Sequence, residues 1–241
     1  MNRQLHSFTS WTVKLAVLLS LSTVVARAAE SSEDERLTSS GNVLKELLGS
    51  SHGIPLSVLG KAECVIILPS VKKAGFIVGA QYGRGAMSCR SGKNFDGAWS
   101  APVMMQSSGG SFGLQAGGQA TDFVILVMND KGARTVTHGK AKLGADASVA
   151  AGPVGRDAEA STNASMGAQM LSYSRAQGVF GGVSLSGTSL GPDGGANEKV
   201  YGKKITGEEI VAGSVPAPAA AADMLSILTA KSPKNLSGGQ K

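Results

Sequence analysis

The stretch Cys64-Val65-Ile66-Ile67-Leu68 (CVIIL) is an uninterrupted apolar run, and Pro69 follows it. A run of this length is short for a helix and fits a strand that is covered on both faces. A second such run, Phe123–Met128 (FVILVM), leads into the turn-forming residues 129–132 (NDKG). The two runs predict central strands of a sheet, and the first of them is expected to end at Pro69.

Shorter segments around these runs alternate partly between apolar and polar residues and are rich in glycine. They predict further strands within 74–90, 133–139, 140–152 and 178–191. The chain has 33 glycines in 241 residues, about twice the usual share of roughly 7%. Glycines among small and β-branched residues indicate tight turns, bulges and closely approaching strands.

Helical patterns lie toward the two ends of the chain. Leucines from Leu37 onward are close to helical spacing, with Gly49 as the stop, and Pro55 opens a short helical turn. Near the other end, Thr206 and Glu209 have the spacing of a capping box, and Pro218 can open an alanine-rich helix. The sequence therefore predicts an α+β fold, with a glycine-rich, mainly antiparallel β core and helices at the N- and C-terminal ends.

The first residues have the features of a secretory signal peptide. Arg3 and Lys14 precede the apolar run 15–26, and 26–28 (ARA) is a small-x-small cleavage signature. The run is shorter than the roughly 20 residues that cross a bilayer. We expect a signal peptide over 1–28, an acidic lead segment over 29–36, one domain over 37–230 and a disordered tail over 231–241.

The charge balance excludes a partner held by the overall field of the protein. The chain has 23 basic and 17 acidic residues. Without Arg3, Lys14 and Arg27, 20 basic residues remain against 17 acidic ones, a formal net charge of +3. Nucleic-acid binding usually requires a larger and clustered excess of positive charge. An anionic partner would have to be held by a local patch.

The two cysteines, Cys64 and Cys89, both lie in segments with the character of strands. In an oxidising compartment an isolated pair most often forms a disulfide, here across strands or between sheets. The alternative interpretation is a reactive thiol or a metal ligand.

Motifs for catalysis or for a cofactor are incomplete. The segment 147–160 (ASVAAGPVGRDAEA) resembles a phosphate loop, but no Gly-Lys pair is followed by Ser or Thr, so a turn at Gly155-Arg156 is the simpler interpretation, with anion contact as the alternative. The match 187–191 (GTSLG) to a nucleophile elbow has no later histidine. His52 and His138 lack the spacing of zinc ligands. We expect no cofactor, no metal and no enzymatic activity.

Several of the longer segments, in their order along the chain, resemble the SYLF lipid-binding domain family. They are 54–85 (IPLSVLGKAECVIILPSVKKAGFIVGAQYGRG), 97–102 (GAWSAP), 109–129, 152–160 and 173–187, followed by 200–213 (VYGKKITGEEIVAG) and 216–225. The resemblance covers about 37–230. It implies a non-enzymatic module. Eukaryotic members bind anionic phospholipids, notably phosphoinositides, through an N-terminal amphipathic segment and basic residues, and some bind and bundle actin.

Carried over to this chain, the resemblance implies an apolar face and a set of cations as the lipid-binding residues. For each of the cations, a solvated surface lysine or arginine is the alternative. The apolar residues are Leu37, Leu44, Leu47 and Leu48; the cations are Lys72, Lys73, Arg156, Lys203 and Lys204.

Two features of the sequence modify this expectation. The acidic lead segment would be repelled by an anionic leaflet. The leader is typical of bacterial export, so we expect a periplasmic or secreted protein, peripherally associated with the membrane. Its lipids would be phosphatidylglycerol or cardiolipin, and actin would not be a partner. The alternative is a structural or protein-interaction module of the cell envelope without a lipid ligand.

Overall fold

The computed structural model describes residues 31–75, 78–112, 117–154, 167–176, 179–182 and 185–238. The predicted signal peptide, Arg156 with most of the segment 152–160, and the last three residues of the predicted tail lie outside these residues. The chain divides by its internal contacts into two units, Met1–Ser31 and Ser32–Lys241. All of the elements described below belong to the second unit.

The described strands form one sheet in the order β5-β9-β3-β2-β1-β4-β7-β6, with β8 paired to β7. Neighbouring strands pair antiparallel except β6 and β7, which are parallel. The bounds are β1 (Cys64–Gly75), β2 (Val78–Cys89), β3 (Val103–Phe112), β4 (Gly117–Val127), β5 (Ala141–Lys142), β6 (Val149–Ala151), β7 (Met170–Ala176), β8 (Val179–Gly182) and β9 (Thr188–Pro192).

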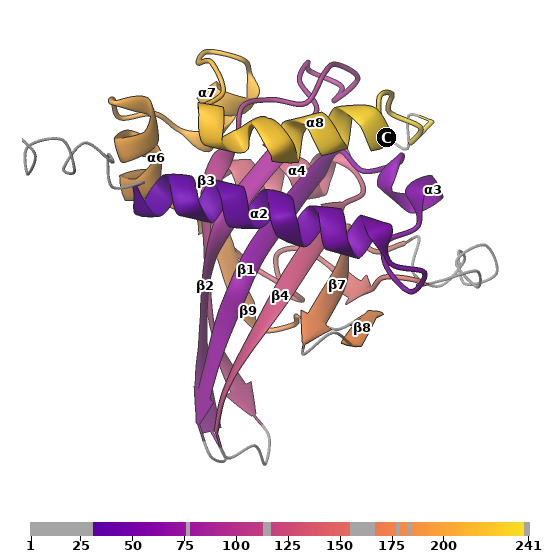
Figure 1. Cartoon of the computed structure of the whole chain (residues 1–241), viewed down its shortest axis with the longest axis vertical. Helices are drawn as coiled ribbons and strands as arrows, with labels where there is room; N and C mark the ends of the chain where they lie inside the picture. Colours follow the sequence, from indigo (N-terminus) through magenta and orange to yellow (C-terminus); the bar gives the residue numbers. More distant parts are fainter. Residues whose placement is uncertain are drawn as a thin grey trace, which may run out of the picture. The chain divides into compact units, whose positions relative to one another are not determined.

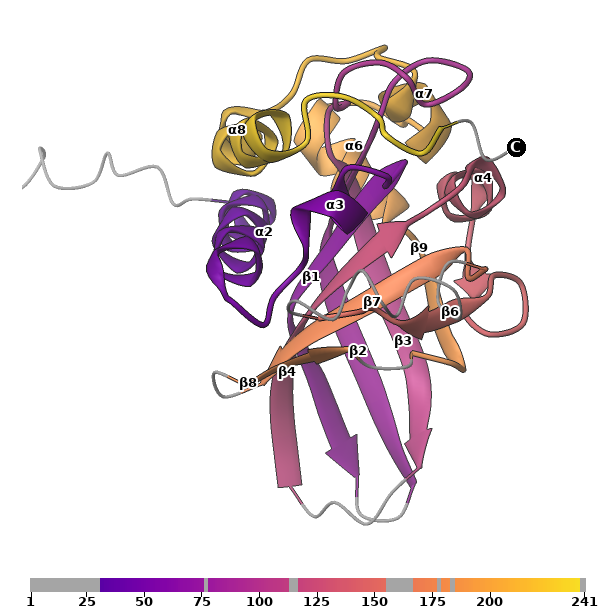
Figure 2. The same ribbon diagram turned by 90° about the vertical axis from the view of Figure 1, so that its right-hand side faces the viewer.

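Helices cover both sides of this sheet. Helices α2 and α8 lie on one side and α4 on the other (Figure 2), while the lower halves of β1 to β4 extend beyond the helices (Figure 1). The arrangement confirms the predicted α+β class, although α4 lies in the middle of the chain. The helices are α2 (Ser32–Gly49), α3 (Leu56–Leu59), α4 (Asp130–His138), α6 (Gly194–Tyr201), α7 (Gly207–Val211), the 3₁₀ helix η2 (Ala219–Ala221) and α8 (Ala222–Lys231).

The apolar run CVIIL lies between two hydrophobic clusters, as its composition predicts. Val65 and Ile67 face a cluster that includes leucines of α2 and Met224 of α8. Ile66 and Leu68 face the opposite cluster, which includes residues of α4 and α7. Because alternate side chains of a strand point to opposite faces, a strand buried on both faces needs an unbroken apolar sequence.

Pro69 does not end β1, and the expectation that it would is wrong. The strand continues to Gly75, with an irregularity in its pairing to β4 between Leu68 and Val71. At this bulge the backbone N–H of Ser70, which has a φ of 50°, donates to Asp122 Oδ1 at 2.8 Å. A bulge accommodates proline because a residue there has no ladder hydrogen bond to donate.

The segment 133–139 forms most of helix α4 and not the predicted strand. The helix begins after Asn129, whose side chain accepts a hydrogen bond from Gly132 N at 2.9 Å. Ala133 and Val136 are buried one helical turn apart. The N-cap and this apolar spacing outweigh the β propensity of the valine and threonines, because tertiary packing readily overrides propensity.

Three local predictions are confirmed. Cys64 and Cys89 are opposite each other on β1 and β2 and form a fully buried disulfide. Thr206 and Glu209 form a capping box at the start of α7. Pro218 directly precedes η2, which continues into α8.

The chain after α8 differs from the predicted disordered tail. Residues 232–238, here called the C-terminal strap, cross Arg90, which is fully buried. The Arg90 guanidinium donates to Ser232 O, Ser232 Oγ and Lys234 O at 3.0, 2.6 and 2.8 Å and lies 4.5 Å from the centre of the Trp99 ring. A buried cation needs such partners, and the strap supplies them.

Candidate functional site

The predicted apolar face of α2 is mostly inside the protein. Leu37, Leu44 and Leu47 are at most 1% exposed and belong to the cluster between α2 and the sheet. In this conformation these three leucines cannot reach a bilayer unless α2 leaves the sheet. Leu48 is only partly buried and remains at the surface.

The four predicted cations that the structure describes do not form one group. Lys72 and Lys73 are consecutive in β1 and point to opposite faces; Lys72 is exposed, and Lys73 Nζ lies 5.9 Å from the centre of the Phe123 ring. Lys203 and Lys204 are exposed in the link between α6 and α7. The lower end of β1 and helices α6 and α7 lie at opposite ends of the sheet (Figure 1).

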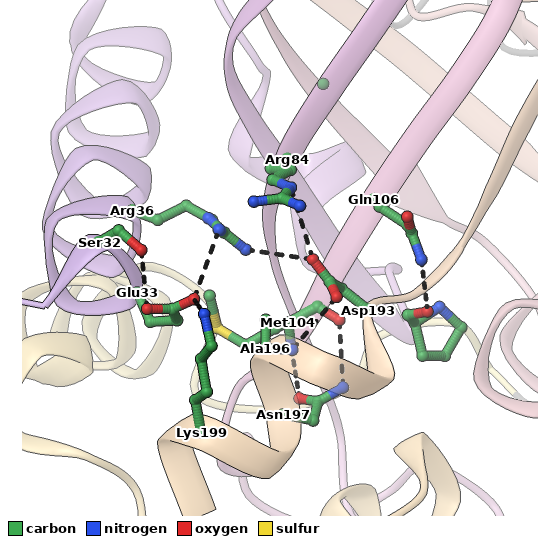
Figure 3. A network of polar contacts seen from close by, with 12 residues as sticks. Ser32, Glu33, Arg36, Arg84, Met104, Gln106, Asp193, Ala196, Asn197 and Lys199 are labelled. Carbon is green, nitrogen blue, oxygen red and sulfur yellow. Dashed lines mark hydrogen bonds and ion pairs between the residues drawn. The ribbon is translucent and has the colours of Figure 1, made fainter.

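The N-terminal end of α2 is held by an ion network, shown in Figure 3. Arg36 Nη1 and Arg84 Nε lie 3.5 and 3.6 Å from Asp193 Oδ2. Lys199 Nζ of α6 lies 3.4 Å from Glu33 Oε1. These five residues, the α2–α6 network, join α2, β2 and α6.

Asp193 has two roles in this network. Its Oδ1 caps α6 by accepting from Ala196 N at 3.2 Å, while its Oδ2 faces the two arginines. Asn197 fixes the same helix to β3 by accepting from Met104 N at 2.8 Å. In the sequence, Asp193 belongs to Pro-Asp-Gly-Gly and reads as a turn; its N-cap position before a helix was the signal that could have marked it.

Glu33 is 5% exposed, and its surroundings favour the carboxylate form. The hydrogen bond from Ser32 Oγ, at 2.8 Å, lowers the pKa of Glu33, and Lys199 acts in the same direction, whereas burial opposes them. The α2–α6 network therefore sets two carboxylates against three cations, and the Arg84 and Lys199 side chains are 49% and 70% exposed. Glu33 was expected in a separate acidic lead, but helix α2 already begins at Ser32.

The other end of α2 borders an open groove, here called the α2–α8 groove, of about 490 Å³. The two helices approach closely at Gly41, where a Cβ atom would lie 3.2 Å from Met224 N, and the groove opens beyond this contact. Its lining residues are Gly41, Asn42, Lys45, Leu48, Gly49, Asp223, Ser226, Ile227 and Lys231.

The groove combines free cations with an apolar wall. Lys45 and Lys231 are exposed and form no ion pair within the described residues. The adjacent Glu46 is paired with Arg175 and so does not neutralise Lys45. Leu48 and Ile227 supply apolar surface. This lining suits a ligand with an anionic part and an apolar part.

Sequence reasoning found only Leu48 among the residues of this groove. Lys45 is three positions before Leu48, and residues at this spacing lie on the same side of a helix. That spacing was the available signal for Lys45. Lys231 comes from the opposite end of the chain, and only the packing of α8 on α2 brings it to the groove.

A histidine–carboxylate pair lies elsewhere, where α4 meets α7. His138 Nδ1 is 3.0 Å from Glu208 Oε1, and both side chains are more than half exposed. Beside them is a pocket of about 310 Å³ whose lining includes Thr137. The Thr137 hydroxyl donates to the backbone oxygens of Ala133 and Arg134, so it is not activated by the histidine.

A metal-binding cluster and a membrane-spanning helix are both absent from the part of the chain that the structure describes. The described residues contain no cluster of three or more His, Cys, Asp or Glu side chains that could hold a metal ion. None of the helices among them has the length and apolar character needed to cross a membrane.

Comparison with known proteins places the domain in a family. Residues 108–231 match the Ysc84 family, described as "Las17-binding protein actin regulator". The SH3 domain-containing protein PJ696.02 of Schizosaccharomyces pombe is 40% identical over 190 residues, which is 78% of this chain and 43% of that protein. Protein YSC84 of Saccharomyces cerevisiae is 36% identical over 77% of this chain and 40% of its own length.

The SH3 domain-containing YSC84-like protein 1 of Homo sapiens is 35% identical over 194 residues, which is 80% of this chain and 56% of that protein. The chain thus spans about half, or less, of the length of these relatives. The predicted family resemblance is confirmed, and the chain belongs to the Ysc84/SYLF family.

Proposed function

We propose that this protein binds anionic phospholipid at the α2–α8 groove, without catalysis, as a peripheral protein of an envelope membrane. The observation that supports the proposal is the groove itself, in which Lys45 and Lys231 stand beside Leu48 and Ile227. The lysines would contact the phosphate of a headgroup, and the apolar side chains would contact the glycerol and the first methylene groups.

The expected attachment is weak and reversible. Each lysine near an anionic surface contributes on the order of 1 kcal/mol. Two lysines alone would therefore give about 2 kcal/mol, which salt screens readily. Stable binding needs additional cations or inserted apolar groups.

The test is co-flotation of the purified mature protein with phosphatidylglycerol–phosphatidylcholine vesicles at low and moderate salt. Pure phosphatidylcholine vesicles are the control for charge. The double variant Lys45→Gln/Lys231→Gln should bind about thirtyfold more weakly, since it removes two surface cations that together contribute about 2 kcal/mol. The matched control is Lys203→Gln/Lys204→Gln, which removes two exposed lysines of the α6–α7 link and should leave binding nearly unchanged.

Two results would overturn the proposal. One is the absence of co-flotation of the unmodified protein with anionic vesicles at either salt concentration. The other is an equal loss of binding in the two lysine pairs, which would mean that general charge and not the groove is responsible.

A second candidate function is a protein-interaction module, and the family description favours it, because it names Las17 binding and actin regulation. Co-sedimentation with filamentous actin tests one form of this candidate. We do not expect actin to be the partner in the cell, because the predicted export would separate the chain from actin. Pull-down from a lipid-depleted envelope extract tests the alternative of an envelope partner, which would be retained without lipid.

A further inference from the structure

Two exposed leucines are found at α3: Leu56 begins this helix, and Leu236 lies over Gly60, its C-cap. Among the described residues, the large apolar side chains with the greatest exposure are Leu56, Tyr82 and Leu236, at 48, 44 and 60%. The Leu236 side chain lies over Gly60, the residue that ends the short helix beginning at Leu56. A Cβ atom at Gly60 would lie 2.9 Å from Leu236 Cδ1 and 3.3 Å from Leu56 O, so glycine permits this contact.

The exposed Leu236 is held on a fixed backbone. Its N–H donates to Gly60 O at 2.8 Å. The preceding Asn235 donates from Nδ2 to Glu63 Oε2 at 2.7 Å and to Phe95 O at 2.8 Å. These contacts hold the backbone, so Leu236 differs from an apolar side chain on a frayed chain end. An exposed apolar side chain on a fixed backbone suggests a surface that a membrane or another molecule covers.

The segments that carry these leucines supply two lysines, and the Glu63 carboxylate that Asn235 contacts is buried. Lys61 follows α3 and Lys234 lies in the C-terminal strap, and neither forms an ion pair within the described residues. The segments 56–61 (LSVLGK) and 232–238 (SPKNLSG) contain no aspartate or glutamate. We call Leu56, Lys61, Lys234 and Leu236 the leucine patch.

The leucine patch lies at the same side of the domain as the open end of the α2–α8 groove. Figure 1 shows α3 and the C-terminal ends of α2 and α8 on one side, and Figure 2 views the domain from that side. Lys231 connects the two features, since it lines the groove and immediately precedes the strap.

We propose that the leucine patch is the surface that docks on an anionic membrane, with Leu56 and Leu236 inserted at the boundary between headgroups and acyl chains. This inference rests on the proposed phospholipid binding and adds the orientation of the protein on the bilayer. Lys61 and Lys234 would lie at the level of the phosphates, because lysines beside inserted apolar groups extend their amines to the headgroups. The charge of these two lysines matches an anionic bilayer.

The test is the double variant Leu56→Ser/Leu236→Ser in co-flotation with phosphatidylglycerol–phosphatidylcholine vesicles. We expect binding to fall about tenfold for each leucine, because about half of each side chain is available for transfer from water. Tyr82→Ser is the matched control, since Tyr82 is similarly exposed but lies on β2, and it should bind as the unmodified protein does. Thermal unfolding of each variant reports whether the fold is intact.

The outcomes separate this inference from the proposed function. If the unmodified protein floats and the leucine variant floats equally well, the leucine patch is not the docking surface, while the proposed function stands. If the unmodified protein does not float, the proposed function and the docking surface both fail.

Should the leucine variant unfold, Lys61→Gln/Lys234→Gln tests the same surface. Weaker binding with a shallower salt dependence supports the docking surface, and unchanged binding overturns it. Self-association through the patch, detected by sedimentation as a dimer that the leucine variant loses, would also overturn it.

Discussion

The two ends of helix α2 differ in what their charges contact. At the N-terminal end, Glu33 and Arg36 are almost fully buried and paired with residues of α6 and its cap. At the C-terminal end, Lys45 is exposed beside the groove and forms no ion pair within the described residues. One end therefore serves the stability of the fold, and the other is free to bind a ligand. Net charge or sequence position alone does not distinguish them.

The largest expected effect concerns Arg90, which fixes the strap near the C-terminal end of α2. Arg90→Met leaves the Lys234 carbonyl group without this donor and the Ser232 carbonyl group with the Trp99 indole N–H, at 3.0 Å, and should lower the free energy of unfolding by about 3–5 kcal/mol. Urea denaturation measures this. Arg84→Met, at the other end, removes a half-exposed ion pair and should cost less than about 1 kcal/mol. Equal costs would contradict the distinction between the two ends.

The disulfide should have a slightly smaller effect. Cys64 follows Glu63 and Cys89 precedes Arg90, so the bridge stiffens the strands that carry the strap's anchors. The double variant Cys64→Ala/Cys89→Ala should lower the free energy of unfolding by about 3–4 kcal/mol on the chain-entropy estimate. A free-thiol assay on the denatured, unreduced protein is the companion measurement, and two reactive thiols in it would show that the bridge does not form.

Asp193 provides a test at the N-terminal end. Asp193→Ala removes the cap of α6 and leaves Arg36 with its 3.9 Å contact to Glu33, so we expect a loss of about 2–3 kcal/mol in unfolding free energy. Vesicle binding of the folded variant should not change. The matched control is Asp223→Ala in the groove, which should hardly alter stability and should strengthen binding to anionic vesicles. Weaker vesicle binding in both variants would contradict the separation of roles.

The smallest expected effect is an opposite pH dependence of two glutamates. The hydrogen bond from Ser32 lowers the pKa of Glu33, so its contribution to stability is present above its unfolded pKa and is lost as the pH falls through the folded pKa. Burial raises the pKa of Glu63, so stability is greater below its unfolded pKa and is lost as the pH rises toward the folded pKa.

Urea denaturation between about pH 3 and pH 7 measures this difference, since the range spans the ordinary glutamate pKa of about 4.3. Relative to the unmodified protein, Glu33→Gln should lose stability with rising pH, and Glu63→Gln should gain it. The same sign of change in both variants would show that one of the two environments is wrongly described.

The sequence was informative where structure depends on neighbours in the chain. The apolar run CVIIL, the capping box at Thr206 and the pair of cysteines all carry local or compositional signals. The bulge at Pro69 was missed because Asp122, on another strand, accepts the hydrogen bond from Ser70 N. The helix α4 was missed because Asn129 was interpreted as a turn residue and not as the N-cap that accepts from Gly132 N. The site was less predictable: Lys45 and Lys231 come from opposite ends of the chain, and the buried leucines of α2 looked like a membrane-binding face because a core-facing stripe has the same spacing.

Hydrogen exchange of the backbone amides, with and without phosphatidylglycerol vesicles, tests the central claim most directly. The account predicts slower exchange on vesicle binding in 45–61 and 223–238, which contain the α2–α8 groove and the leucine patch. It predicts no change in 78–85 of β2. Slowing confined to β1 and β2, or no slowing anywhere under conditions in which the protein floats with the vesicles, would contradict it.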